Sequence, residues 1–274
     1  MAAAGRLTLR RLLAGSNLPD LEAKVLAQHA LGVSRAWLVA RLDEPVDVQQ
    51  ARAVERLYAR RQSGEPVAYI TGEREFYSLD FAVSPAVLIP RPETELLVAL
   101  ALQALEGRGG RVLDLGTGSG AVAVAIAHHA PDAEVWALDA SEKALEVARA
   151  NVDRHRVNVR LVRSDWFSRL PAERFDVIVG NPPYVAENDP HLREGDLRYE
   201  PHDALATGAD GLAAIRSIVA QAPRHLEAGG ALFLEHGWDQ AERCRDLLAA
   251  CGFHGVTSWD DLAGIPRVSG GNVA

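Results

Sequence analysis

From residue 111 onward, short apolar runs alternate with segments of helical character, and this alternation limits the possible folds more than any other feature. The apolar runs are residues 112–115, 134–138, 159–162, 175–179 and 231–234, and the helical segments include 121–129, 142–151 and 211–225. Such a pattern predicts right-handed β-α-β units and an α/β fold, with a mostly parallel sheet covered by helices on both faces. Ligands of these folds bind beyond the carboxyl ends of the strands.

The first seventy residues differ from this region because they show helical periodicity and no strand pattern. Pro19 suits the first position of a helix. A second helix is indicated from Val48, with apolar side chains at Ala51, Val54, Leu57 and Tyr58. These segments predict a small helical bundle.

Residues 73–88 connect the two regions with alternating apolar and polar side chains, which predicts a hairpin. The following stretch, 93–105, again has helical character. At 274 residues the chain is long enough for two domains. We therefore expect a helical domain at residues 1–70, a hairpin linker at 71–90 and an α/β domain at 91–274.

Charge is unevenly distributed along the chain, whose formal net charge is −8. Residues 1–66 carry ten Lys and Arg against seven Asp and Glu, whereas residues 67–274 carry nineteen against thirty. An acidic α/β domain is poorly suited to gripping a phosphate backbone, so no direct nucleic-acid binding is expected. The positive excess of the first region fits a partner surface or ordinary solvation equally well.

The sequence contains no uncharged apolar run of about 18 residues, and arginines interrupt its apolar N-terminal stretch. We expect neither a membrane span nor a secretory leader, and place the protein in the cytoplasm as a monomer. Cys244 and Cys251 lie on one expected helix and are not predicted to bond to each other. The nine histidines lack metal-ligand spacing, so no metal site is expected.

A glycine-rich loop follows the first strand of the α/β region. It consists of Gly116, Thr117, Gly118, Ser119 and Gly120. Glycines permit positive φ and a close approach of a ligand to the backbone, and the next helix begins with free N–H groups. Nicotinamide enzymes use a similar loop, but the spacing here is G-x-G-x-G with Asp114 just before it.

The next two strand ends carry groups suited to adenosine. Asp139 ends the second strand, where its carboxylate can accept both ribose hydroxyls, although it could instead cap the helix that follows. Asp165 and Trp166 follow the third strand and could supply a carboxylate for the adenine amine and a flat face for the ring. Three successive strand ends of this kind favour an adenosine-containing cofactor.

This combination resembles the class I S-adenosylmethionine-dependent methyltransferases. The resemblance implies a Rossmann-like sheet of seven strands with the last one antiparallel, and residues 252–258 and 267–272 could form its terminal hairpin. It also implies that S-adenosylmethionine binds at the glycine loop, with its methyl group toward the end of the fourth strand and S-adenosylhomocysteine as the product.

The fourth strand ends in GNPPYV, residues 180–185. Two adjacent prolines remove two backbone donors, so the strand must stop and its last carbonyls stay free. A planar nitrogen that donated its hydrogens to the Asn181 side-chain oxygen and the Pro182 carbonyl would have its lone pair aimed at the methyl group. Tyr184 could pack on the flat face of such a substrate. The motif fits a glutamine amide or the exocyclic amine of adenine or cytosine.

A narrower resemblance rests on five stretches of sequence. They are GEREFYSLDFAVSPAVLIPRPETELLV (72–98), RVLDLGTGSGAVAVAIA (111–127), SDWF (164–167), NPPYVAENDPHLREGDLRYEP (181–201) and LFLEHGW (232–238). Together they are similar to the glutamine-N5 methyltransferases that act on peptide chain release factors. The resemblance covers roughly residues 65–267 and implies that the substrate is the glutamine of the Gly-Gly-Gln loop of a release factor.

The family pattern also implies roles for individual residues. It assigns Gly116 to Gly120, Asp139, Trp166 and Asn181 to the cofactor, and Asn181, Pro182, Pro183 and Tyr184 to the glutamine side chain. The N-terminal helices are implied to hold the release factor. Arg91 and Glu93 fit either the pocket wall or a structural salt bridge.

The chain departs from the family at residues 269–274, SGGNVA, where an aromatic strand end is common, so the form of the last strand is open. Other functions are alternatives. A related enzyme methylates a glutamine of a ribosomal protein, and adenine methylation of nucleic acid is more distant because the acidic α/β region offers little for phosphates. A docking module without catalysis would not need Asn181 and Tyr184, and a nicotinamide oxidoreductase shares only the fold.

Overall fold

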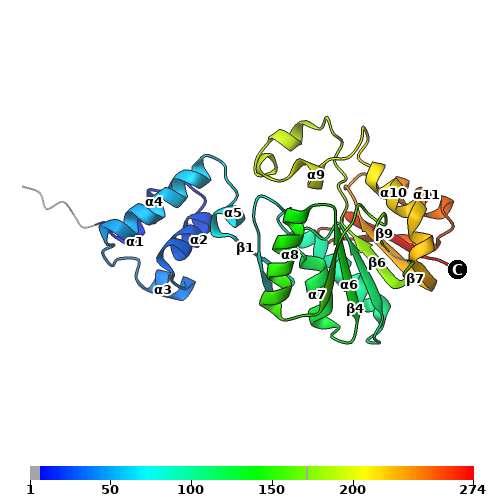
Figure 1. The fold of residues 1–274 in the computed structure, drawn as a ribbon. Helices are drawn as coiled ribbons and strands as arrows, with labels where there is room; N and C mark the ends of the chain where they lie inside the picture. Colours follow the sequence, from blue (N-terminus) through cyan, green and yellow to red (C-terminus); the bar gives the residue numbers. More distant parts are fainter. Residues whose placement is uncertain (1–6, 171) are drawn as a thin grey trace, which may run out of the picture. The chain divides into compact units, whose positions relative to one another are not determined.

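The two regions of the sequence fold as separate units, Met1–Gly72 and Glu73–Ala274, in a computed structural model that describes residues 7–170 and 172–274 (Figure 1). The first unit is helical. Its helices are α1 (Leu9–Ala14), α2 (Asp20–Leu31), α3 (Arg35–Ala40), α4 (Val48–Gln62) and α5 (Val67–Thr71). Leu26, Leu38 and Val54 have no exposed surface, so these helices share one small core.

Polar caps define where the helices of the first unit begin. Ser34 accepts a hydrogen bond from the Trp37 backbone, and Asp47 forms a capping box with Gln50 at the start of α4. The expected position of Pro19 is wrong by one residue. Its ψ of 136° is extended, so Pro19 is the cap and α2 begins at Asp20.

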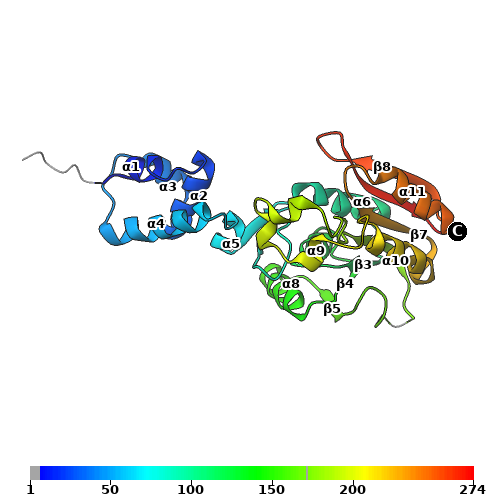
Figure 2. The same ribbon diagram turned by 90° about the horizontal axis from the view of Figure 1, so that it is seen from above.

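The second unit is built on a sheet of seven strands in the order β5-β4-β3-β6-β7-β9-β8 (Figures 1 and 2). The strands are β3 (Arg111–Leu115), β4 (Glu134–Asp139), β5 (Val159–Arg163), β6 (Phe175–Gly180), β7 (Leu226–Glu235), β8 (His254–Asp260) and β9 (Pro266–Asn272). All neighbouring pairs are parallel except those made by β9. The structure thus confirms the predicted α/β fold with its mostly parallel sheet.

Both faces of the sheet are covered because the apolar strand residues alternate between two cores. Val112 and Val177 belong to one core, with the helices α6 (Glu95–Leu105), α7 (Ala121–His129) and α8 (Glu142–His155). Leu113 and Ile178 belong to the other, with α10 (Ala213–Gln221) and α11 (Ala241–Ala250). This period of two is the expected side-chain pattern of a strand buried on both faces.

Two hairpins complete the second unit. The first is β1 (Glu73–Phe76) with β2 (Leu79–Ala82), and the second joins β8 and β9 at the end of the chain. The last strand forms although its sequence is rich in glycine. A Cβ at Gly270 would lie 2.6 Å from the Phe233 ring and 3.2 Å from Trp259, so glycine leaves room for those two rings to pack edge to face.

The remaining elements are short and lie mainly in the connections. They are the 3₁₀ helices η1 (Pro92–Thr94), η2 (Pro190–Arg193), η3 (Leu197–Tyr199) and η4 (Ala222–His225), and the helix α9 (His202–Leu205). Cys244 lies in α11 and Cys251 directly follows it, and the two thiols are free. Over residues 7–170 and 172–274, the helices are too short or too polar to cross a membrane.

Candidate active site

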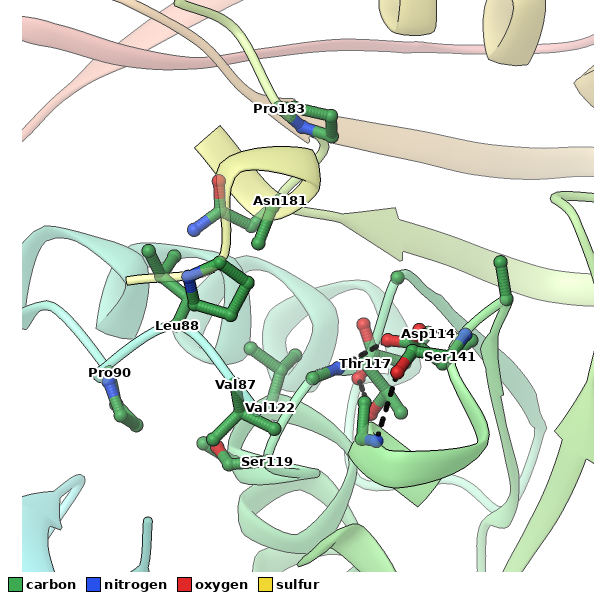
Figure 3. A pocket seen from close by; sticks show the side chains of 18 of the residues that line it. Val87, Leu88, Pro90, Asp114, Thr117, Ser119, Val122, Ser141, Asn181 and Pro183 are labelled. Carbon is green, nitrogen blue, oxygen red and sulfur yellow. Dashed lines mark hydrogen bonds between the residues drawn. The ribbon is translucent and has the colours of Figure 1, made fainter. Parts of the chain in front are cut away.

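A cavity of about 510 Å³ opens where β3, β4, β5 and β6 end (Figure 3). Of the predicted site residues, its walls include Gly116, Thr117, Gly118, Ser119, Asp139, Asp165, Trp166, Asn181 and Pro183. Gly120, Pro182 and Tyr184 lie next to the walls in sequence but do not line the cavity. The structure therefore brings the cofactor loop, the acidic strand ends and the Asn-Pro-Pro-Tyr turn together around one space.

The three loop glycines adopt conformations that other residues avoid. Gly116, Gly118 and Gly120 have φ values of 70°, 55° and 81°. Gly120 has a further role, since a Cβ there would lie 3.1 Å from the Cβ of Ala148 in α8. Gly120 thus allows the start of α7 to pack closely against α8. Gly120 positions the loop in this way, although it does not line the cavity itself.

Asp114 holds the glycine loop in place through a hydrogen bond to Thr117. Its side chain is 2% exposed, and its Oδ2 accepts a hydrogen bond from the Thr117 hydroxyl at 2.6 Å. Burial raises the pKa of Asp114 to about 7, although the hydrogen bonds from Thr117 and the Ala123 backbone lower this pKa. Thr117 also donates its backbone N–H to the Leu138 carbonyl at 2.9 Å, which ties the loop to β4.

Asp139 holds the same loop from the side. Its Oδ2 accepts from the Gly118 N–H at 2.9 Å, and its Oδ1 accepts from the Ser141 N–H at 2.8 Å. The cap of α8 is Ser141, which accepts from the Ala144 N–H, so the alternative role of Asp139 as that cap is wrong. Burial raises the pKa of Asp139. Each of its oxygens keeps a further lone pair, with which it can accept a ligand hydroxyl.

Asn151 is a buried residue of α8 that the sequence did not identify. Its Nδ2 donates to the Ser119 carbonyl at 2.8 Å and to the Ala82 carbonyl at 2.9 Å, and its Oδ1 accepts from the Ala82 N–H at 2.7 Å. It thereby joins the glycine loop to the β1–β2 hairpin. A signal was present, because Asn151 continues the apolar stripe of Ala144 and Ala148 at helical spacing.

Replacing Asn151 with alanine is expected to lower the free energy of unfolding by about 2–4 kcal/mol, because three buried hydrogen bonds are lost at once. Chemical denaturation measures this change, and the exposed Asn158→Ala is the matched control. A loss as small as that of the control, within about 0.5 kcal/mol, contradicts the role given to Asn151.

The residues that follow β5 form another part of the cavity wall. Trp166 has a φ of 45°, and the Ser164 hydroxyl donates to the Trp166 carbonyl at 2.7 Å. A Cβ at Gly116 would lie 3.5 Å from the Trp166 ring, so that ring borders the glycine loop. Asp165 is exposed beside it. This corner therefore combines an aromatic face with a carboxylate.

Asn181 begins the turn after β6 and is held in one orientation. Its Nδ2 donates to the Thr94 hydroxyl at 3.1 Å, whereas its Oδ1 has no hydrogen-bond partner among the described residues. Figure 3 shows the Asn181 and Pro183 side chains across the cavity from Asp114 and Thr117. Sheet pairing of β6 ends at Gly180, and within residues 7–170 and 172–274 the Pro182 carbonyl accepts no hydrogen bond. The Asn181 side-chain oxygen and the Pro182 carbonyl oxygen are thus both free to accept a hydrogen bond.

The chain after the turn is held by residues far away in sequence. Gln240 donates from Nε2 to the Tyr184 carbonyl at 2.9 Å and accepts from the Gly237 N–H at 2.8 Å. Gly211 packs so tightly that a Cβ there would lie 2.2 Å from the Tyr184 carbonyl oxygen. Sequence reasoning missed both contacts, because nothing local at Gly211 or Gln240 indicates a partner at Tyr184.

The Tyr184 side chain points toward the end of β7. Its hydroxyl donates to Glu235 Oε1 at 3.3 Å, and burial raises the pKa of Tyr184 well above its usual value. The hydroxyl is therefore a proton donor throughout the physiological range. Glu235 is 1% exposed, and burial raises its pKa to about 7.

Arg91 and Glu93 differ in their surroundings. Arg91 lines the cavity and forms a salt bridge with the buried carboxylate of Glu200, which also accepts from the Ile89 N–H at 3.1 Å. Arg91 therefore has both of the roles considered for it: it is part of the cavity wall and it forms a structural salt bridge. Glu93 does not line the cavity.

Comparison with known families gives two matches along the chain. The profile of the PrmC N-terminal domain matches residues 6–72, and the profile of the methyltransferase small domain matches residues 92–194. The release factor glutamine methyltransferase of Bordetella pertussis is 54% identical over 265 residues, which is 96% of this chain and 98% of the relative. The Escherichia coli protein of that name is 42% identical over 258 residues, with 94% and 93% covered.

Solved structures share the fold at lower identity. A methyltransferase from Pyrococcus furiosus superposes with a TM-score of 0.55 at 23% identity, covering 78% of this chain and 95% of its own. The 16S rRNA N2 G1207 methyltransferase of Thermus thermophilus, solved with AdoMet and guanosine, gives 0.57 at 21% identity, covering 74% and 50%. These similarities confirm the predicted class I methyltransferase fold.

Proposed function

The chain belongs to the release factor glutamine methyltransferase family, and we propose that its cavity is where S-adenosylmethionine and the substrate glutamine meet. The enzyme transfers a methyl group from S-adenosylmethionine to the side-chain nitrogen, N5, of a glutamine in peptide chain release factors. We further propose that this is the glutamine of the Gly-Gly-Gln loop. The observation that carries the site proposal is Asn181, whose amide nitrogen is held by Thr94 while its oxygen is left for a donor.

The residues around the cavity fit the cofactor. The backbone of Gly116 to Ser119 can border its methionine portion, Asp139 can accept the ribose hydroxyls, and the Trp166 ring with Asp165 can receive the adenine. Asp139 suits that role because the two backbone bonds already fix its carboxylate. When bound, S-adenosylmethionine supplies an electrophilic methyl group on a positively charged sulfur. Gly120 serves this site indirectly, through the packing of α7 on α8.

Asn181 and Pro182 orient the substrate nitrogen. An amide nitrogen is a poor nucleophile because its lone pair is delocalised into the carbonyl, so positioning matters more than deprotonation. Its two N–H groups donate to Asn181 Oδ1 and the Pro182 carbonyl, which aims the lone pair into the cavity. Pro183 lines the same wall. Tyr184 lies outside the cavity and supports the turn through its hydroxyl bond to Glu235. The nitrogen loses a proton after it has become acidic through methylation, so no strong general base is required.

Incorporation of tritium tests this function directly. The enzyme is incubated with S-adenosylmethionine labelled in its methyl group and with a release factor, and the protein is then digested and analysed by mass spectrometry. The proposal expects label on the glutamine of the Gly-Gly-Gln loop and none after that glutamine is replaced by alanine. Label on another residue, or equal label on a ribosomal protein in a parallel incubation, contradicts it.

We propose that the helical unit, the predicted domain of residues 1–70, binds the release factor. This unit carries a positive excess, and it has a groove of its own lined by Leu7, Pro45, Val46, Asp47, Val48, Ala51, Arg52 and Glu55. Val48 is 64% exposed and Leu7 is 38% exposed, so the groove offers apolar surface beside the charged Arg52. Apolar anchors ringed by charge are typical of protein-binding surfaces.

Introducing Val48→Asp together with Arg52→Glu is expected to raise the KM for release factor about tenfold, the effect of losing roughly 1.4 kcal/mol of binding energy. The KM for S-adenosylmethionine should not change, because its proposed site lies entirely in the second unit. Val39→Asp, at a position 49% exposed in α3, is the control. An unchanged KM for release factor in the double variant contradicts the binding role of this groove.

Three further expectations follow from the proposed function. We expect the enzyme to act as a monomer. The acidic balance of residues 67–274 supports a protein substrate without direct nucleic-acid binding. A translation factor as substrate supports activity in the cytoplasm. Sedimentation at micromolar concentration tests the first of these, and titration with RNA at low salt tests the second.

A further inference from the structure

We propose that His236 is a positioning residue for methyl transfer, which holds the Asn-Pro-Pro-Tyr turn in place by way of Gln240. The inference rests on the proposed clamp, because it concerns the turn that carries Asn181 and the Pro182 carbonyl. Neither His236 nor Gln240 lines the cavity. Any effect of the His236 ring on the reaction must therefore pass through neighbours that contact the turn.

His236 directly follows β7 and has no exposed surface. Its backbone N–H donates to the Arg267 carbonyl at 2.9 Å, so pairing with β9 fixes the main chain at this point. The imidazole ring makes two further hydrogen bonds, one between Nδ1 and the Gly237 carbonyl at 2.9 Å and one between Nε2 and the Ser269 hydroxyl at 2.8 Å. Because both ring nitrogens bond to the protein, the ring has one orientation.

These partners decide which ring nitrogen carries the proton. A carbonyl oxygen only accepts, so Nδ1 is the donor to Gly237, and Nε2 of the neutral ring accepts from Ser269. Ser269 uses its one hydroxyl proton on His236, so the Ser258 hydroxyl, 2.8 Å away, must donate to Ser269. Arg245 of α11 donates to the Ser258 oxygen at 2.8 Å. This outer arm joins the ring to β8, β9 and α11.

The surroundings of His236 favour the neutral ring. Burial lowers the pKa of His236, and the hydrogen bond to the Gly237 carbonyl opposes this. The positive charges of Arg267 and Arg245 also lower the pKa, whereas Asp239 raises it. A neutral ring has one donor and one acceptor, which matches the carbonyl on one side and the hydroxyl on the other.

The inner arm leads from the ring to the turn. The Gly237 carbonyl that accepts from His236 also accepts from the Gln240 backbone N–H at 3.0 Å, and Gln240 Oε1 accepts from the Gly237 N–H at 2.8 Å. With its oxygen held in this way, the Gln240 amide directs Nε2 to the Tyr184 carbonyl at 2.9 Å. A Cβ at Gly237 would lie 3.2 Å from the Gln240 side chain, so the two residues pack closely.

The two arms therefore have different consequences for the reaction. Without the Nδ1 bond, the Gly237 carbonyl loses one of its two donors, and the turn of residues 237–240 is less restrained. The Gln240 amide can then shift, and the Tyr184 carbonyl shifts with it, two residues after Pro182. A displacement of about 1 Å in a positioned group can cost two orders of magnitude in rate. Loss of the outer arm alone should affect stability and leave the turn in place.

Two variants of His236 separate the arms. Glutamine can place its amide near the position of Nε2 and asparagine near that of Nδ1, so His236→Gln can keep the outer arm and His236→Asn the inner arm. We expect kcat on release factor to fall about tenfold in His236→Gln and less than about threefold in His236→Asn. Both should unfold about 4–8 °C below the wild-type enzyme, since each loses a buried hydrogen bond. KM for S-adenosylmethionine should stay within about twofold in both.

His254→Gln is the matched control, because His254 is exposed in β8, and it should keep the wild-type kcat and unfolding temperature. Gln240→Met tests whether the effect passes through Gln240, since methionine is of similar length but lacks the amide. It should lower kcat at least as much as His236→Gln. The double variant should fall no further than Gln240→Met alone, because both changes break the same path.

The inference is overturned if His236→Gln keeps the wild-type kcat, if both His236 variants lose kcat equally, or if the losses from His236→Gln and Gln240→Met multiply. If His236→Gln does not fold, which circular dichroism will show, His236→Asn and Gln240→Met carry the test. The first should then keep most of kcat and the second lose it, and equal values overturn the inference. If wild-type enzyme does not label the release-factor glutamine at all, the proposed function itself fails, so the two failures are distinguishable.

Discussion

Replacing Asn181 with alanine is expected to lower the rate of methyl transfer about a hundredfold or more, the scale of losing one positioned polar group at a reacting centre. Alanine removes the oxygen that receives one N–H of the substrate amide, so the nitrogen lone pair is no longer held in line. Affinity for S-adenosylmethionine should fall much less, because the glycine loop, Asp139 and Trp166 remain in place. Single-turnover kinetics measure the rate, and calorimetry measures the affinity.

Asn188→Ala is the matched control for this prediction. Asn188 is exposed in the same connection after β6 and does not line the cavity. Its replacement should leave rate and affinity as they are. Equal losses of rate and cofactor affinity in Asn181→Ala would show that Asn181 serves mainly the cofactor, against the clamp proposed here.

Replacing Gly211 with alanine is the second change with a large expected effect, although it adds only one methyl group. The φ of Gly211 is 72°, and the added Cβ would lie 2.2 Å from the Tyr184 oxygen and 2.9 Å from Gln240 Nε2. Either the backbone of the turn moves or the Gln240 bond to Tyr184 breaks. We expect stability to fall by about 2–4 kcal/mol from strain and overpacking together.

Activity of Gly211→Ala should fall more than tenfold even where the protein remains folded, since a shift of about 1 Å in a positioned group can cost two orders of magnitude. Gly195→Ala separates strain from the clash, because Gly195 also has a positive φ of 51° but no atom within 4 Å of the position that the added methyl group would take. Denaturation curves and initial rates compare the two. If both variants lose equal stability and activity, the close contact with Tyr184 has no special role.

Much of the fold could be predicted because strand and helix periods are local properties of the sequence. The strand at 112–115 and the helix at 121–129 lie within a residue of where they are observed. β7 was predicted too short, as residues 231–234, because Gly229 and Gly230 interrupt its apolar pattern. In the structure Leu226 pairs with Phe175 before a shift in register, so the strand runs through these glycines.

The helix predicted at 211–225 was too long at both ends for a similar reason. Gly211 has a positive φ that no α-helix contains, so α10 begins at Ala213. Pro223 lacks a backbone N–H, and the segment from Ala222 continues as 3₁₀ helix. Both boundaries depend on how the backbone meets its neighbours, which apolar periodicity does not record.

The site was predictable where its residues end strands, since parallel strands bring their carboxyl ends to one edge of the sheet. The glycine loop, Asp139, Trp166 and Asn181 meet at the cavity for that reason. The supporting residues were not predicted. Thr94 and Gln240 contact the Asn-Pro-Pro-Tyr turn from 87 and 56 residues away, so their partners depend on the tertiary arrangement.

The proposed clamp can be tested most directly by a crystal structure of the enzyme with S-adenosylhomocysteine and a release factor. We expect the N5 nitrogen of the bound glutamine to lie about 3 Å from both Asn181 Oδ1 and the Pro182 carbonyl oxygen, with Asn181 Nδ2 still on Thr94. A glutamine nitrogen bound elsewhere, or an Asn181 oxygen turned toward Thr94, would contradict the account.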